Sequence, residues 1–541
     1  MAGTPPDCGV LNGGQEVVRC RFRWKWIAWG ALVVIAGAVR FVNLGNIPGV
    51  NADEAWEAMI VAELMDGVLP DLATASGRLK LNPLYLLFCA PFQWLAPHSF
   101  AAMRAGIAVS GVLSVLLAIW VGRRTVGEQA GWLLAVLMAV SPPLIAYSRL
   151  AWDVGQLPLL TVPALYLALR GRGIAAAACG AFAVLVYPAG VFLMPVIAGA
   201  LVGRWAREAD RNRVLEGLSW AAAVAVCLLV AGLLLLTSVD AQWVWDRIDL
   251  RRLGALSDWK TCLAGIVELL TGPTTYQYVS GPVSTLARWC HGLVFVAVWF
   301  PVVWVGTRVQ IRRSEWEACG AATGFIAAFV LLLVAGGPTA FTAGTERFAL
   351  VLVVPALLIL AQCAAAVLQT SVRTRRAWIV LLSGYALFCL VSHGWYFHGR
   401  FYRTGGSGEV VFSTGSREPK HVASTVITEW AGERSVTVIA QGWWAYWPLA
   451  YQLRDRKNIT LVSFSETRMT LSRLKRLMEQ GACAVGFSGY RFEGALFQLY
   501  APSELRRRVI RDYAGKPVMF VAQVAEATSA SLSALESPEA R

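Results

Sequence analysis

Residues 26–54 read WIAWGALVVIAGAVRFVNLGNIPGVNADE, an apolar run followed by a short loop and the adjacent acids Asp53 and Glu54. A run of this length is typical of a helix that crosses the roughly 30 Å hydrocarbon core of a bilayer. The two carboxylates therefore come where such a helix leaves the membrane. Arg78 and Lys80 follow before the next apolar segment. Paired acids and then bases at one face of a bilayer indicate chemistry on a charged, lipid-bound substrate.

The composition of the whole chain also indicates a membrane protein. Its 541 residues are 57% hydrophobic and 15% charged, which is too apolar for a soluble globular protein. The net charge of +14 does not indicate a nucleic-acid partner, because the basic residues cluster in short loops between apolar runs, as the positive-inside rule predicts. The first apolar run follows about 25 polar and basic residues and has no small-residue cleavage site, so we expect a signal anchor.

We expect eleven transmembrane helices, near residues 26–44, 101–122, 129–147, 155–170, 173–187, 188–203, 217–237, 289–308, 317–336, 346–368 and 376–393. The basic groups in the intervening loops fall on one side only if the apolar segment Asn82–Pro97 does not cross. That segment contains three prolines and is shorter than the roughly 20 residues a span needs. We therefore predict that it lies in the outer interface of the plasma (inner) membrane. The amino terminus is then cytoplasmic, and the acids and bases quoted above face outward.

The expected architecture is an all-α polytopic membrane module with a small carboxy-terminal α/β domain. The module covers residues 26–393, with a first outer loop at 45–100, after a basic, disordered cytoplasmic segment at 1–25. Beyond it, strand-like and helical stretches alternate, which predicts an extracytoplasmic α/β domain at 394–526 and a disordered tail at 527–541. The strand-like runs are Ser435–Gln441, Ile459–Phe464, Ala482–Phe487 and Val518–Val524, and the helical stretches include Thr467–Gln480 and Ser503–Tyr513.

Asp53 and Glu54 allow a structural interpretation as well as a catalytic one. Asn51-x-x-Glu54 resembles a capping box that opens a helix over Glu54–Asp66, which Gly67 closes. An acidic first turn also suits the helix dipole. This interpretation accounts for Glu54 but does not require Asp53. Because adjacent residues point in different directions, one acid can cap the helix while its neighbour faces a site.

Other charged residues at the outer face also allow two interpretations. Arg149 and Asp153 form either a surface ion pair, worth under about 1 kcal/mol, or part of a site. Arg347 is either an interfacial anchor or a site cation. Lys80 binds either lipid head groups or a substrate. Together these residues give the outer face two separated acids and several cations beside the bilayer, which transfer from a lipid phosphate would need.

An ordered set of motifs resembles those of the glycosyltransferase-C superfamily. The motifs are Arg40-Phe41-x-x-Leu44-x-x-Ile47-Pro48-x-x-x-x-Asp53-Glu54-Ala55, Lys80-x-Asn82-Pro83-Leu84-Tyr85, Ala102-Met103-Arg104, Ser141-Pro142 through Ser148-Arg149 to Asp153, and Glu346-Arg347-Phe348 with Pro355. They are most similar to the branch with protein O-mannosyltransferases and the aminoarabinose and galacturonic-acid transferases of lipopolysaccharide. Asn82 stands where that branch has proline. The carboxy-terminal domain departs from the better-known members.

The resemblance implies an inverting glycosyltransferase that moves a monosaccharide from a polyprenyl-phosphate donor to a hydroxyl of an acceptor protein, lipid or glycan. Asp53 would be the general base, Glu54 its structural support, and Asp153 the acid that orients the donor sugar or holds a basic partner. The candidate cations for the donor phosphate are Lys80, Arg149, Arg347 and, more weakly, Arg78. These roles fit the chemistry, because cations that neutralise the developing charge make a phosphodiester a good leaving group.

The sequence does not demand a metal site or a disulfide bond. Some superfamily members use a divalent metal, and Asp53, Glu54 and Asp153 have suitable oxygen ligands, but their spacing does not demand one. No Cys/His cluster has metal-ligand spacing, and we expect no required metal. Cys262 and Cys290 flank one loop and could pair if that loop is extracytoplasmic.

An aromatic cluster in the carboxy-terminal domain also allows two interpretations. The cluster QGWWAYWP at Gln441–Pro448 is expected to pack against the membrane module, the alternative being acceptor-glycan binding.

Two other classes of function are less compatible with the sequence. A secondary transporter would place ionisable residues near the membrane midplane, whereas the predicted span interiors are nearly free of charge. A catalytically inactive scaffold is disfavoured because the motif acids and bases are all present.

Overall fold

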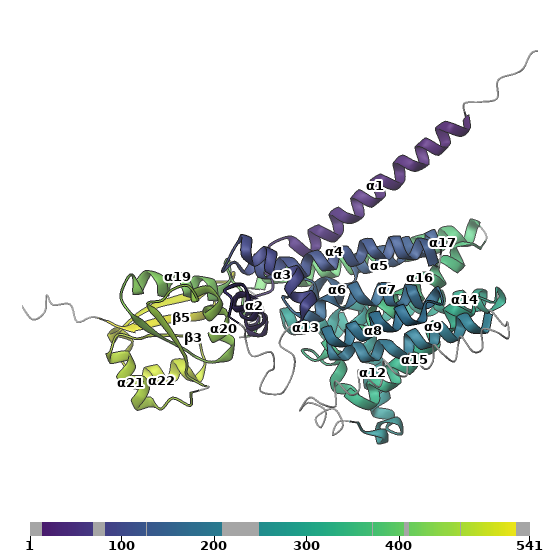
Figure 1. Cartoon of the computed structure of the whole chain (residues 1–541). Coiled ribbons are helices and arrows are strands. Elements are labelled where there is room, and N and C mark those ends of the chain that lie inside the picture. Colours follow the sequence, from purple (N-terminus) through teal and green to yellow (C-terminus); the bar gives the residue numbers. More distant parts are fainter. Residues whose placement is uncertain are drawn as a thin grey trace, which may run out of the picture.

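The computed structural model describes residues 13–68, 82–125, 127–207, 248–370, 372–404, 411–465 and 467–525. These residues form a bundle of helices and a smaller domain built on a five-stranded sheet, which lies at one end of the bundle (Figure 1). Arg78, Lys80, the predicted span at 217–237 and the predicted tail lie outside the described residues.

The helices of the bundle follow the predicted spans, except that α12 and α13 lie between two of them, in a segment without a predicted span. They are α1 (Gly13–Phe41), α4 (Phe100–Thr125), α5 (Glu128–Val140), α6 (Pro142–Tyr147), α7 (Leu157–Leu169), α8 (Gly173–Val186), α9 (Met194–Arg207), α12 (Leu256–Thr271), α13 (Pro273–Ser280), α14 (Thr285–Arg312), α15 (Trp316–Gly336), α16 (Val353–Leu368) and α17 (Val372–His393). In the described part of the chain, six helices are long and apolar enough to cross a membrane, and shorter apolar helices occupy the other described spans. The protein is therefore a multi-pass membrane protein. The count of eleven spans stays a prediction.

Two helices extend beyond their predicted limits. α1 begins at Gly13, before the predicted start of the first span at residue 26. The segment after Gly14 contains no proline or glycine and is rich in helix-forming side chains, so the apolar helix continues backward through it. α17 continues through a π-helical turn into α18 (Arg400–Thr404).

The basic loops gather at the end of the bundle away from the sheet domain (Figure 1). Arg204 and Arg207 at the end of α9 pair with Glu317 at the start of α15, at 3.3 and 3.0 Å. Arg313, after α14, donates a hydrogen bond to Gln369, after α16. This arrangement agrees with the predicted one-sided distribution of basic loops. That this side is cytoplasmic stays a prediction.

Helices α2 (Ala52–Met65) and α3 (Pro83–Leu95) belong to the predicted first outer loop. The predicted capping box is confirmed: Asn51 Oδ1 accepts from the Asp53 N–H at 2.8 Å, and Glu54 Oε1 accepts from the Asn51 N–H at 2.9 Å. Asn82, the departure from the family motif, caps α3 by accepting from two backbone N–H groups at 3.0 and 3.1 Å. With 13 residues, α3 spans only about 20 Å, which suits the predicted interfacial position.

The carboxy-terminal domain is an α/β domain, as predicted. Its strands are β1 (Val436–Ala440), β2 (Ile459–Ser463), β3 (Cys483–Phe487), β4 (Leu505–Arg511) and β5 (Pro517–Val524), in the spatial order β2-β1-β3-β5-β4. β1 is parallel to β2 and β3, and β5 is antiparallel to β3 and β4. Its helices are α19 (Pro419–Ala431), α20 (Trp443–Leu453), α21 (Leu471–Glu479) and α22 (Arg491–Leu499).

One predicted element of this domain and one predicted bond are wrong. Ser503–Tyr513 is not a helix, because most of it forms the edge strand β4. Its arginines favour a helix locally, but pairing with β5 decides the outcome, and exposed arginines are well suited to an edge strand. Cys262 and Cys290 are free thiols, one buried on α12 and the other exposed on α14, so the pairing considered above is not formed.

Candidate active site

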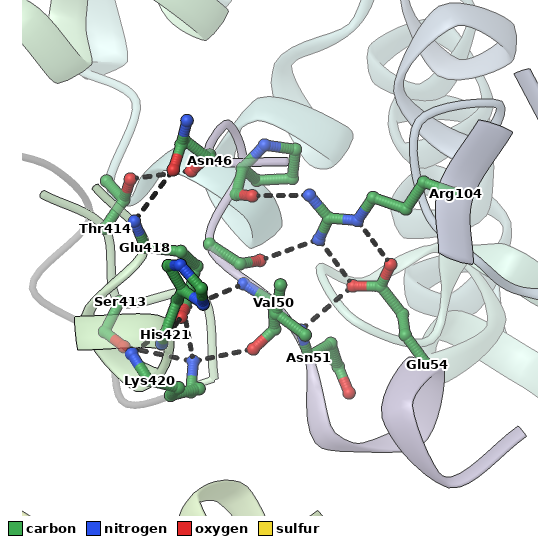
Figure 2. A network of polar contacts seen from close by, with 12 residues as sticks. Asn46, Val50, Asn51, Glu54, Arg104, Ser413, Thr414, Glu418, Lys420 and His421 are labelled. Carbon is green, nitrogen blue, oxygen red and sulfur yellow. Dashed lines mark hydrogen bonds and ion pairs between the residues drawn. The ribbon is translucent and has the colours of Figure 1, made fainter. Parts of the chain in front are cut away.

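The buried ion pair of Glu54 and Arg104 anchors the first outer loop (Figure 2). Both side chains have no exposed surface. Arg104 Nε and Nη2 donate to the two carboxylate oxygens of Glu54, each at 2.7 Å. The same guanidinium donates to the carbonyls of Leu44, Pro48 and Gly49 at 2.8 to 3.1 Å. The loop therefore wraps around one arginine on α4.

Glu54 has its acceptor capacity filled by the protein. Besides Arg104, its carboxylate accepts from the Asn51 N–H and from the Ala151 N–H, the latter at 2.7 Å. The second of these bonds ties the start of α2 to the loop that precedes Asp153. Glu54 thus holds the start of α2 and the loop before Asp153 together. Its supporting role in catalysis stays a prediction.

Asp53, the neighbour of Glu54, points to the opposite side and remains accessible. Its side chain is about a third exposed (32%). Asp53 Oδ1 accepts a hydrogen bond from the indole Nε1 of Trp443 at 2.9 Å, and Oδ2 lies 3.8 Å from Nη1 of Arg347. The carboxylate therefore lies where the first loop, the turn before α16 and the sheet domain meet.

The guanidinium of Arg347 lies over two aromatic rings and retains hydrogen-bonding capacity. Its guanidinium carbon lies 5.2 Å from the ring centroid of Trp152 and 5.7 Å from that of Phe348. Its Nε is buried and has no hydrogen-bond partner among the described residues. A cation with an unused, inward donor beside Asp53 is suited to an oxygen-rich anion.

Two further acids lie beside Asp53. Glu57 follows one helical turn later on the same face of α2, and a backbone N–H of Asp153 donates to its carboxylate. Burial raises the pKa of Glu57 well above its usual range, and the charges of Asp153 and Asp53 raise it further. Asp153 starts the 3₁₀ turn Asp153–Gln156, which Gln156 fastens to α3 by donating to the Leu84 carbonyl at 3.1 Å. The site therefore joins three carboxylates and Arg347.

Arg149 does not face this site. Its guanidinium is buried and donates to the backbone carbonyls of Val39, Val42 and Ile47 at 3.0, 2.8 and 2.6 Å. Both terminal nitrogens of the guanidinium are thus engaged by the protein, whereas its buried Nε has no hydrogen-bond partner among the described residues. In this structure Arg149 fixes the chain at the end of α1, and its predicted contact with the donor phosphate stays a prediction.

The sheet domain is clamped onto the same first loop (Figure 2). Lys420 Nζ donates to the Val50 carbonyl at 2.6 Å and pairs with Glu418 at 3.2 Å, while Glu418 accepts from the Val50 N–H at 3.2 Å. A Cβ at Gly49 would lie 1.9 Å from the Ser413 carbonyl, so this close approach requires glycine. Burial lowers the pKa of Lys420, an effect that Glu418 opposes.

The aromatic cluster packs against the membrane module, as predicted. Trp443 lies 6.5 Å from Trp56 of α2, between ring centroids, and Tyr451 stacks on Phe100 of α4 at 6.2 Å. The sequence analysis missed that Trp443 also reaches Asp53, and it missed Glu57. The spacing of four residues between Asp53 and Glu57 was the signal for the second; the sequence has no local signal for the first.

In the described residues, no group of three or more His, Cys, Asp or Glu side chains has the geometry to hold a metal ion. Whether activity needs a divalent metal stays a prediction.

The fold is shared with solved membrane proteins, although neither a protein-family model nor a curated protein matches the chain. ArnT from Cupriavidus metallidurans in the apo state superposes with a TM-score of 0.52 at 16% identity, over 96% of this chain and 100% of that chain. Its complex with undecaprenyl phosphate gives 0.50 at 16%, over 95% and 99%. The apo oligosaccharyltransferase of Archaeoglobus fulgidus gives 0.50 at 13%, over 86% and 69%. The chain therefore shares the multi-pass membrane fold of these transferases, and this agrees with the family resemblance in the sequence motifs.

Breaking the buried pair should destabilise the protein. In Arg104→Met the carboxylate of Glu54 stays buried without its cation, and we expect a loss of about 3–5 kcal/mol, measured as a lower melting temperature of the detergent-solubilised protein. Arg123→Met removes an exposed pair with Glu128 and should change the melting temperature little. Equal melting of wild type and Arg104→Met would show that the loop does not depend on this pair.

Glu57→Gln should stabilise the protein at high pH only. Because the folded-state pKa of Glu57 lies above the ordinary 4.5, ionising it costs more in the folded protein than in the unfolded chain. This cost is absent below pH 4.5 and grows as the pH rises through the folded-state pKa. We expect the variant to melt a few degrees above wild type near pH 8 and equally near pH 4. Glu63→Gln on the same helix is the control, and a pH-independent difference would contradict the shift.

Proposed function

We propose that this protein is an integral-membrane inverting glycosyltransferase that moves a monosaccharide from a polyprenyl-phosphate donor to an acceptor hydroxyl on the outer face of the membrane. The observation that carries the proposal is the meeting of the accessible Asp53 carboxylate with the Arg347 guanidinium, 3.8 Å apart, in a glycosyltransferase-C fold. The structure of ArnT with undecaprenyl phosphate supports a lipid-phosphate donor.

In the proposed reaction Asp53 is the general base. It takes the proton of the acceptor hydroxyl as that oxygen attacks the anomeric carbon from the face opposite the phosphate. The bond between the anomeric carbon and the phosphate oxygen breaks, and the phosphate leaves with the electron pair, so the anomeric configuration inverts. A positioned base contributes about 10²–10⁴-fold, and alignment of donor and acceptor contributes more.

Arg347 is the proposed cation for the departing phosphate. Its buried, unpartnered Nε and its position over Trp152 fit a site that neutralises charge in a partly water-excluded place. Lys80 and Arg78 stay proposed as further phosphate ligands on sequence grounds. Asp153 is proposed to orient the donor sugar. A more readily protonated Glu57 reduces the negative charge that the donor phosphate meets.

Asp53→Asn should lower sugar transfer at least about 10²-fold, because the amide cannot accept the acceptor proton. The assay follows transfer from synthetic polyprenyl-phosphate sugars by purified protein. Asp66→Asn, at the exposed far end of α2, is the matched control and should keep wild-type activity. Undiminished transfer by Asp53→Asn would remove the base assignment. Absence of transfer by wild type with any donor would favour a transporter or an inactive scaffold.

Arg347→Gln should weaken donor binding more than the removal of a distant arginine does. Loss of a charge-assisted bond to phosphate corresponds to roughly a tenfold or greater rise in the donor Kd. Titration with undecaprenyl phosphate measures it directly and does not depend on catalysis. Arg313→Gln, at the other end of the bundle, is the control. Equal affinities for both variants and wild type would exclude Arg347 as a phosphate ligand.

A further inference from the structure

The candidate base receives one of its hydrogen bonds from the sheet domain. Trp443 stands at the start of α20, 390 residues from Asp53 in the chain, and its indole N–H donates to Asp53 Oδ1 at 2.9 Å. α20 follows β1 directly, so the end of a central strand of the sheet sets the position of this side chain. The membrane module alone therefore does not complete the surroundings of Asp53.

The Trp443 bond determines how Asp53 presents its two oxygens. The backbone N–H of Asp53 is already bound by Asn51, and Asn51 and Glu54 cap the helix, so the Asp53 side chain is not needed as a cap. Without a second partner, the carboxylate could rotate toward Arg347 and close the 3.8 Å gap to an ion pair. A neutral donor on Oδ1 restrains that rotation and leaves Oδ2 on the side of the cation.

Trp443 is itself held by aromatic packing. Its ring lies 6.5 Å from that of Trp56 and 5.5 Å from that of Trp447, in tilted and edge-on arrangements. Before it, Gly442 approaches Ser465 so closely that a Cβ would lie 2.4 Å from the Ser465 hydroxyl. An aromatic ring fixed on two sides loses little freedom when it donates, so its bond is suited to positioning.

From this geometry we infer that Trp443 is a positioning residue of the active site, which holds the Asp53 carboxylate in its reactive orientation and makes catalysis depend on docking of the sheet domain. The inference rests on the proposed function of Asp53. Trp443 is not itself a catalytic residue in this scheme, because it acts through Asp53. The clamp of Glu418 and Lys420 on Val50 would then serve activity as well as stability.

Trp443→Phe and Trp447→Phe form a matched pair of variants. Each removes one indole from the same cluster, but the Nε1 of Trp447 has no hydrogen-bond partner among the described residues. Only Trp443→Phe should lower kcat, by about tenfold to a hundredfold, as expected for a lost bond to a charged group. The melting temperatures of both variants should be similar.

The separate effects on kcat and KM distinguish positioning from a structural role. The charged and titratable groups that face Asp53 are Arg347, Glu57, Asp153 and Tyr278, and neither variant changes them. In Trp443→Phe kcat should therefore fall while the KM for the lipid-linked donor stays near the wild-type value. In Trp447→Phe both constants should stay near the wild-type values.

The outcomes distinguish this inference from the proposed function. An inactive wild type would defeat the proposed function. An active wild type with equal kcat and equal KM in Trp443→Phe and Trp447→Phe would overturn the positioning role alone. Equal losses of kcat in both variants, with lower melting temperatures, would show that the cluster only docks the domain, and would also overturn it.

Discussion

The buried pair of Glu54 and Arg104 is the constraint on which the half of the bundle next to the sheet domain depends. One guanidinium binds the carboxylate and three carbonyls, and the carboxylate also binds the backbone at Asn51 and Ala151. Separating such a pair would leave a charge in a site with no exposed surface, which is costly. Because Glu54 is turned inward by these bonds, the adjacent Asp53 is turned outward. The orientation of the candidate base is therefore a consequence of a structural ion pair.

The same loop carries the sheet domain on its other side. Val50 gives its N–H to Glu418 and its carbonyl to Lys420, while the carbonyl of Gly49 binds Arg104. A displacement of the loop would disturb the inner pair and the outer clamp together. Docking of the domain and the geometry around Asp53 are thus linked through a few backbone groups, without any need for a long chain of contacts.

Features that depend on neighbouring residues could be predicted from the sequence, whereas features that depend on packing between distant segments could not. Hydropathy locates the spans, and the spacing of Asn51 and Glu54 fixes the cap of α2, because both depend on neighbouring residues. The strand β4 depends on pairing with β5, so its arginine-rich segment was predicted as a helix. Arg149 was predicted as a phosphate ligand from its motif, but in the folded chain its guanidinium donates to carbonyls at the end of α1. The contact of Trp443 with Asp53 arises only in the folded chain.

The environments of the three acids in the first two turns of α2 separate their roles. Glu54 is permanently paired, Glu57 holds its proton more firmly, and Asp53 is both accessible and bonded to a neutral donor. At 3.8 Å the contact of Asp53 with Arg347 is longer than a closed, charge-assisted hydrogen bond of about 2.7–2.9 Å. In the proposed reaction a donor phosphate, with more oxygens than one carboxylate, binds Arg347 and draws it from Asp53. Arrival of the donor would then free the Asp53 carboxylate for the acceptor hydroxyl, so that one arginine couples donor binding to acceptor binding.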